Sequence, residues 1–176
     1  MRFLKTIDLR VAQIVKIERH PKADKLYIEN LETANDEGAA EQRLIVSGLV
    51  PFYKEEELLN KKIIIAYNLK AANLRGIESR GMLLAAQDQN GPPNAEGKGS
   101  LRVEVLDAGE VPVGTRVKVE GVDSGAAENV PAEIDIETFF SISIQVKNNT
   151  VIVGDKILTL NGKPIKTKTV SEGEVH

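Results

Sequence analysis

The sequence predicts an all-β protein, built as a small barrel followed by a β-rich C-terminal extension. Two early stretches alternate apolar and polar residues, as half-buried strands do. Several later runs are short and almost wholly apolar, as strands buried on both faces are. Turn-forming Gly, Pro and Asn residues separate the runs, and 176 residues suffice for one domain of common size plus an appendage.

The first predicted strands lie at residues 8–17 and 25–31, and the segment His20-Pro21-Lys22-Ala23-Asp24 between them is a predicted turn because proline cannot donate to a strand ladder. A third strand at 44–47 ends at Gly48, and the charged residues 54–59 predict one or two turns of helix. The remaining strands of the barrel are expected at 62–67, 82–87, 101–106 and 115–119.

Two connecting segments organise the rest of the chain. Residues 89–100 are rich in Gly, Pro and Asn, and residues 121–127 place a boundary between a domain at 1–121 and an extension at 122–176. The extension predicts a short helix within 132–140 and two hairpins, the second turning at Asn161-Gly162. About fifty residues are too few for an independent core, so we expect the extension to pack on the barrel.

Composition limits compartment and chemistry. The chain has no cysteine, which removes disulfides, thiolate nucleophiles and cysteine-bound zinc and favours a reducing compartment. The N-terminal residues lack the apolar core of a signal peptide, and no run approaches the ~20 apolar residues that span a bilayer. We therefore expect a cytoplasmic protein without a membrane partner.

Catalytic chemistry is sparse in the sequence. The two histidines, His20 and His176, have no evident triad or metal partner, and Ser47 lacks the glycine that a nucleophile elbow places two residues before its serine. We therefore expect no catalytic residue, no metal site and no cofactor.

The net charge of -3 conceals a segregation of charge along the chain. Residues 1–25 hold seven Lys/Arg against three Asp/Glu, and residues 61–80 hold five against one, whereas residues 26–60 hold two against eight. Because the local field steers a polyanion, two basic segments remain compatible with a nucleic-acid partner.

The second basic segment contains a polar stretch, residues 68–82, between two apolar runs. Lys70, Arg75 and Arg80 are suited to phosphates, and Asn68 to phosphate or ribose oxygens. The alternative is an ordinary solvated hairpin loop, which charge alone favours.

Four blocks in order change that balance: Asp8-Leu9-Arg10-Val11, His20 to Tyr27, Ile45 to Leu49, and Asn68-Leu69-Lys70 with Arg75-Gly76, Ser79 and Gly81-Met82. Together they resemble the tRNA-binding domain family, which includes the endothelial monocyte-activating polypeptide II domain and the C-terminal domain of methionyl-tRNA synthetase. The resemblance covers residues 6 to about 120. It implies a five-stranded oligonucleotide-binding (OB-fold) barrel.

By resemblance, the tRNA surface includes Asn68, Lys70, Arg75, Ser79 and Met82; charge alone adds Arg80 and Lys25. The family's usual proline after the lysine is Ala71 here, which removes no charge. No Phe or Tyr lies within the stretch, so recognition of tRNA shape through its backbone fits better than base stacking.

Residues 132–176 resemble the extension of the longer branch of this family, which stands in for the second subunit of the shorter, dimeric branch. The resemblance therefore implies a monomer with a pseudo-dimer interface.

The leading hypothesis is a non-catalytic module that supplies tRNA to an aminoacyl-tRNA synthetase, in cis or in trans, the parent being an enzyme such as methionyl-, tyrosyl- or lysyl-tRNA synthetase. A second is a released cytokine-like domain acting through Arg10 to Lys16. A third, a chaperone-like dimer, is disfavoured by the extension.

Overall fold

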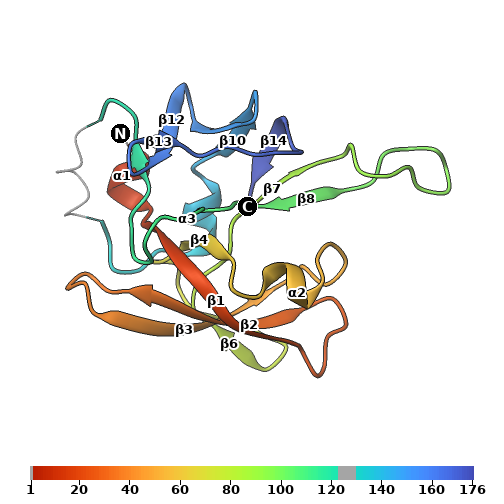
Figure 1. Cartoon of the computed structure of the whole chain (residues 1–176), viewed down its shortest axis with the longest axis horizontal. Helices are drawn as coiled ribbons and strands as arrows, with labels where there is room; N and C mark the ends of the chain where they lie inside the picture. Colours follow the sequence, from red (N-terminus) through yellow and green to blue (C-terminus); the bar gives the residue numbers. More distant parts are fainter. Residues whose placement is uncertain (1, 123–129) are drawn as a thin grey trace.

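The computed structural model describes residues 2–122 and 130–176, and these residues form mostly β structure around short helices (Figure 1). The helices are α1 (Arg2–Thr6), α2 (Glu55–Leu58) and α3 (Ile136–Phe140). The strands are β1 (Leu9–Arg19), β2 (Tyr27–Ala34), β3 (Ala40–Ser47), β4 (Lys62–Ala66), β5 (Ala72–Leu74), β6 (Ile77–Ser79), β7 (Ala85–Asp88), β8 (Arg102–Val105), β9 (Lys118–Val119), β10 (Ile144–Lys147), β11 (Thr150–Val153), β12 (Lys156–Leu160), β13 (Lys163–Pro164) and β14 (Glu172–Val175).

The N-terminal part is a four-stranded antiparallel sheet in the order β3-β2-β1-β4. Isolated bridges extend it, pairing Ile65 with Leu83, Ile63 with Asp107 and Arg10 with Arg116. The described ladders do not close into a five-stranded barrel. The strand pattern in the sequence predicted β1 to β4 and β7 to β9, but not β5 and β6. The expected five-stranded barrel is not seen in the described part of the chain, because only single bridges extend the sheet where a closed barrel would have continuous ladders.

The second sheet joins the extension to the preceding part of the chain. Strand β14 pairs with β7, placing Glu174 opposite Gln87, and β12 pairs with β9. The hairpin β10–β11 and the Asn161-Gly162 turn between β12 and β13 are both present, and Asp135 caps α3 by accepting a hydrogen bond from the Thr138 N–H at 2.7 Å. Most of the boundary segment 121–127 lies outside the described residues.

Two apolar cores lie on opposite sides of β4 and the segment 83–86. Ile63 and Ile65 face one core within the first sheet, whereas Ile64 and Ala66 face a second core shared with the extension. Leu83 and Leu84 divide in the same way. Because adjacent strand residues point to opposite faces, burial on both faces requires an unbroken apolar run.

Helix α1 was not expected from the sequence. Its Phe3 and Leu4 are buried in the core shared with the extension, so packing rather than local propensity stabilises this single turn and a half.

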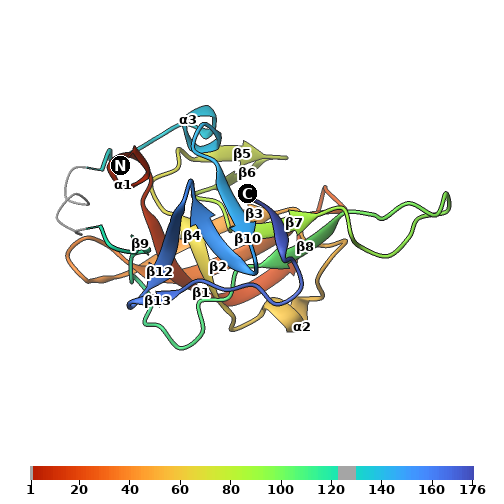
Figure 2. The same ribbon diagram turned by 90° about the horizontal axis from the view of Figure 1, so that it is seen from above.

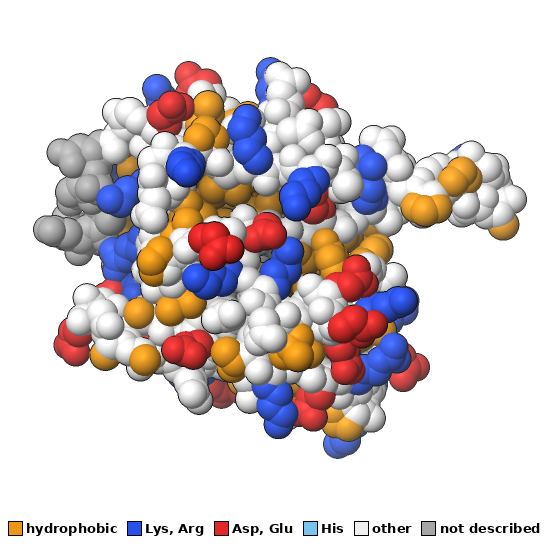
Figure 3. Space-filling view, in the orientation of Figure 1, with side chains coloured by type: hydrophobic (Ala, Val, Ile, Leu, Met, Phe, Trp, Pro, Cys, Tyr) orange, Lys and Arg blue, Asp and Glu red, His pale blue; other side chains and the backbone are white. Residues whose placement is uncertain are grey.

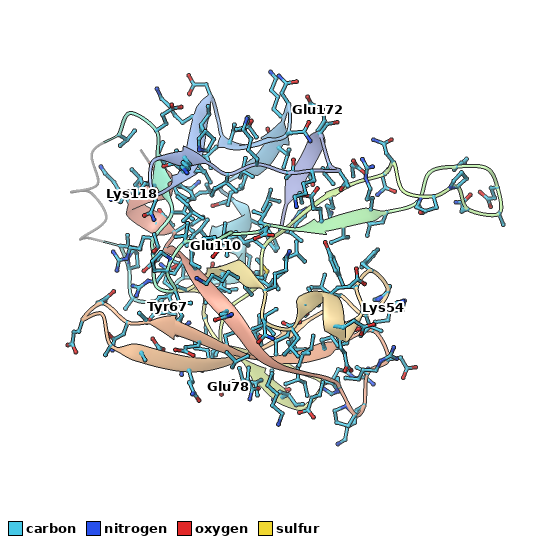
Figure 4. All side chains as sticks on the ribbon, viewed as in Figure 1. Lys54, Tyr67, Glu78, Glu110, Lys118 and Glu172 are labelled. Atoms are coloured by element: carbon cyan, nitrogen blue, oxygen red, sulfur yellow. The ribbon has the colours of Figure 1, made fainter. Side chains whose placement is uncertain are left out.

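A buried ionic network lies where β1 begins. The Arg10 guanidinium bonds both carboxylate oxygens of Asp8, with Nη2 at 2.7 Å from Oδ2, and also bonds Asp36. It lies 3.6 Å from the ring centre of Tyr67, which Figure 4 labels. Burial alone would lower the pKa of Arg10, but the hydrogen bond and charge of Asp8, together with the hydrogen bond to Asp36, outweigh it and raise that pKa.

Strands β7 and β8 continue into a long hairpin, residues 89–101, that projects away from the body of the molecule in both ribbon views (Figures 1 and 2). On the face shown in Figure 3, basic and acidic side chains are interspersed around exposed apolar ones. No helix in the described residues is long and apolar enough to cross a bilayer.

Glu29 generates a prediction about pH. Its side chain is fully buried on β2, one oxygen accepts a hydrogen bond from the Ser47 hydroxyl, and Oε2 has no partner among the described residues. Burial raises the pKa of Glu29 to about 7, against the smaller opposing effect of Ser47. Because the folded state then holds its proton more tightly than the unfolded state, stability is lost as pH rises from about 4.5 to about 7.

We expect Glu29→Gln to remove this loss and to raise the free energy of unfolding at pH 8 by up to roughly 3 kcal/mol, with little effect at pH 4.5. Urea unfolding at both pH values measures it, with the exposed Glu18→Gln as the matched control. Equal gains at both pH values would contradict burial as the cause.

Candidate nucleic-acid interface

The polar stretch 68–82 contains a β-hairpin. Strands β5 and β6 pair from Ala72–Ser79 to Leu74–Ile77, and Arg75-Gly76 makes the two-residue turn. Both turn residues have positive φ, 56° and 92°, which the preferred hairpin turn requires. The Asn73 side chain stabilises this turn by accepting a hydrogen bond from the Gly76 N–H at 2.8 Å.

The start of the stretch is held by the extension. The Lys70 N–H donates to the Ile134 carbonyl at 2.8 Å, and the Ile134 N–H donates to the Asn68 carbonyl at 2.8 Å. This short parallel pairing leaves the Lys70 side chain exposed. The extension therefore fixes the backbone from which Lys70 projects.

Asn68, expected to contact the ligand, is 4% exposed. Its Oδ1 accepts a hydrogen bond from the Asp8 N–H at 3.0 Å, and its Nδ2 donates to the carbonyls of Thr6 and Pro131, each at 2.9 Å. Its side chain thus links the polar stretch to the segment before β1 and to the extension, and so helps to hold the start of the stretch in place.

Ser79 has a similar position at the other end. It is 3% exposed, and its hydroxyl accepts from the Val46 N–H at 2.9 Å and donates to the Gly81 carbonyl at 3.1 Å. These bonds dock β6 against the end of β3. Gly81 has φ of 120°, which strains any other residue, and an added Cβ would be crowded at 3.1 Å from the Ala66 carbonyl oxygen, so glycine is favoured there.

Arg43 ties the two ends together. Its Nη1 donates to the carbonyls of Tyr67 at 2.7 Å and Arg80 at 3.3 Å, and its Nε bonds Glu41 at 3.0 Å. Burial would raise the pKa of Glu41, but hydrogen bonds from Tyr67 and Arg43 outweigh it and lower that pKa. A carboxylate beneath the stretch therefore stays charged and keeps Arg43 in place. This role of Arg43 was not predicted from the sequence.

The predicted site residues thus fall into two groups. The side chains of Lys25, Lys70, Arg75 and Arg80 are exposed, whereas Asn68 and Ser79 are buried and Met82 is half-buried against the core. Lys22, which the sequence did not single out, lies beside the hairpin tip, where its carbonyl accepts from Arg75 Nη2 at 3.2 Å. In Figures 1 and 2 the hairpin lies against β3, on the side opposite α2.

An apolar groove of about 530 Å³ borders the hairpin, lined by Leu74, Met82, Phe52, Leu101 and Ile136 among others. It lies between the β5–β6 hairpin and the base of the long hairpin 89–101. Within residues 2–122 and 130–176, no three acidic or histidine side chains gather as metal ligands would. The surface at this hairpin thus combines exposed cations with an apolar groove, which suits binding of a ligand.

We expect Ser79→Ala to lower the free energy of unfolding by about 1–3 kcal/mol, because the buried Val46 N–H loses its partner. Chemical denaturation measures it, and Ser143→Ala, at an exposed position, serves as the control. A change in Ser79→Ala no larger than that of the control would show that the hydroxyl does not anchor β6.

Comparison with known proteins agrees with this description. Residues 9–116 match the family model described as "Putative tRNA binding domain". Among curated proteins, the chain is 44% identical over 180 residues to a methionine–tRNA ligase of Treponema denticola, covering 98% of this chain and 21% of that protein. It is 39% identical to the cytoplasmic tyrosine–tRNA ligase of Gallus gallus, covering 70% of this chain and 21% of that protein.

Among solved structures, the C-terminal domain of Plasmodium vivax p43 superposes over the whole of both chains, with a TM-score of 0.81 and 25% identity. The chain spans about a fifth of the length of the curated relatives above. Because the family model matches from β1 to Arg116, more than half of the sequence, this chain belongs to the tRNA-binding domain family.

Proposed function

We propose that this chain is a non-catalytic, structure-specific tRNA-binding module that supplies tRNA to an aminoacyl-tRNA synthetase in the cytoplasm. The observation that carries the proposal is the hairpin: Lys70, Arg75 and Arg80 project from a backbone fixed by buried polar side chains. Cations held in fixed places suit a polyanion of defined shape, since phosphate contacts set register and orientation.

The relation to the synthetase rests on the relatives. Methionine–tRNA ligases contain a segment like this chain within proteins about five times as long. A module joined to or docked on a catalytic domain raises the local concentration of tRNA, and this requires only modest intrinsic affinity.

We further propose that the first sheet with its bridges is an open form of the family's five-stranded OB-fold barrel, within a domain at 1–121. Residues 122–176 would then be a pseudo-dimer extension that keeps the chain monomeric. The apolar face of Leu9, Val11, Ile64 and Ala66 supports this, because the extension supplies the apolar side chains that cover it.

The signalling alternative gains no support from the structure. It requires access to Arg10 to Lys16, but Arg10, Val11, Ala12 and Ile14 are buried within β1.

Removing two cations tests the proposal. We expect Lys70→Gln with Arg75→Asn to weaken tRNA binding on the order of tenfold at low salt and to reduce the salt slope by about 1.4–1.8, the value for two lost phosphate contacts. Asparagine suits position 75 because it tolerates positive φ. Gel shifts across a salt series measure both quantities.

The matched control is Lys147→Gln with Lys156→Gln, which removes the same charge from exposed positions on the extension. Equal losses in the two double variants would mean that net charge, and not this surface, governs binding.

Oligomeric state tests the extension. We expect the full chain to sediment as a monomer and a fragment ending at residue 122 to self-associate, because it exposes the apolar face that the extension covers. Sedimentation velocity distinguishes them; a dimeric full chain, or a monomeric folded fragment, would contradict the pseudo-dimer role.

A further inference from the structure

His20 is buried although it lies in a turn. Its flanking residues Arg19 and Pro21 are exposed, whereas its own side chain is 5% exposed. The tip of the β5–β6 hairpin contacts it, although Leu74 follows it by 54 residues. No catalytic or metal-binding role was expected for His20, so its burial needs another explanation.

The two ring nitrogens of His20 bond different segments. Nδ1 lies 3.0 Å from the Lys22 N, and Nε2 lies 3.1 Å from the Leu74 carbonyl oxygen. A backbone N–H only donates and a carbonyl only accepts, so Nδ1 accepts while Nε2 carries the proton and donates. The ring therefore bridges the turn and the hairpin as the neutral Nε2–H tautomer.

Arg75 adds a second link in the opposite direction, because its Nη2 donates to the Lys22 carbonyl at 3.2 Å. Two backbone hydrogen bonds close the turn itself. The His20 N–H donates to the Leu26 carbonyl at 2.9 Å, and the Leu26 N–H donates to the Ala23 carbonyl at 3.2 Å. Lys22 thus has both its N–H and its carbonyl bonded, to the side chains of His20 and Arg75 respectively. We call the two contacts between the turn and the hairpin, His20 to Leu74 and Arg75 to Lys22, the clasp.

The clasp brings together charges from two distant basic segments. Lys22 and Lys25 in the turn and Arg75 at the hairpin tip are all exposed, and so are the carboxylates of Asp24 in the turn and Glu78 on β6, which Figure 4 labels. Cations therefore outnumber acids, and their backbone is pre-ordered before any ligand arrives. Pre-ordering lowers the entropy cost of binding.

We propose that Lys22 is an RNA-contact residue and that His20 is its positioning residue, holding the turn 20–25 against the hairpin so that Lys22, Lys25 and Arg75 meet one RNA backbone together. This rests on the proposed function, and it extends the binding surface from the hairpin to a second segment of the chain. His20 itself contacts no ligand.

His20→Asn breaks the contact from residue 20 to the hairpin but keeps the hydrogen bond within the turn. The asparagine Oδ1 takes the place of Nδ1 and still accepts from the Lys22 N–H, but the side chain no longer reaches Leu74. We expect this change to weaken tRNA binding about three- to fivefold and to lower the salt slope by about 0.7–0.9, the value for one phosphate contact. Lys22→Gln should do the same.

The combination of the two changes is decisive. If His20 acts by placing Lys22, the double variant binds no more than about twofold more weakly than either single variant. Losses that multiply, or a Lys22→Gln variant that binds as the unaltered protein does, would overturn the proposal. Lys156→Gln, at an exposed position on the extension, is the matched control for Lys22→Gln and should leave binding unchanged.

Amide hydrogen exchange supplies a readout independent of binding. In His20→Asn, the Ala72–Ser79 hairpin should exchange faster while the melting temperature of the body stays within a few degrees. Unchanged exchange in the hairpin would overturn the clasp. Should Lys70→Gln with Arg75→Asn lose binding while His20→Asn does not, this inference fails and the proposed function stands; an unaltered protein that binds no tRNA refutes both.

Discussion

Burial of β4 and the segment 83–86 on both faces is the constraint on which the rest of the structure depends. Ile63 and Ile65 complete the core of the first sheet, and Ile64 and Ala66 meet apolar side chains from the extension. A strand in this position has no solvated face, so neither part of the chain is complete without the other. The extension is thus a structural part of the molecule.

The same arrangement determines where the polar stretch 68–82 lies. This stretch follows β4 and leads into the segment 83–86. Both of its ends are therefore joined to backbone that is buried between the two cores. Asn68, Ser79 and Arg43 then anchor it with hydrogen bonds to backbone groups. The exposed cations consequently project from a backbone that is held by buried hydrogen bonds, and under the proposed function this would reduce the ordering that binding requires.

The sequence predicted the fold class, most strands and the hairpins of the extension, because each depends on local alternation or turn chemistry. It did not predict α1, whose Phe3 and Leu4 are held by distant partners, nor the open ladders of the first sheet. For the candidate site, the family resemblance identified Lys70 and Arg75, and charge alone added Arg80. The buried positions of Asn68 and Ser79, and the clasp at His20, arise from contacts across 33 to 63 residues that no local pattern records.

If tRNA binds the surface formed by the hairpin and the adjoining turn, amide hydrogen exchange of the intact protein with and without tRNA will reveal the contact. At low salt, tRNA should slow exchange in residues 20–26 and 68–82 and leave β10 to β13 unchanged, and this protection should fade as salt rises. Protection confined to the extension or to the long hairpin 89–101, with residues 68–82 unaffected, would show that tRNA binds elsewhere on the protein.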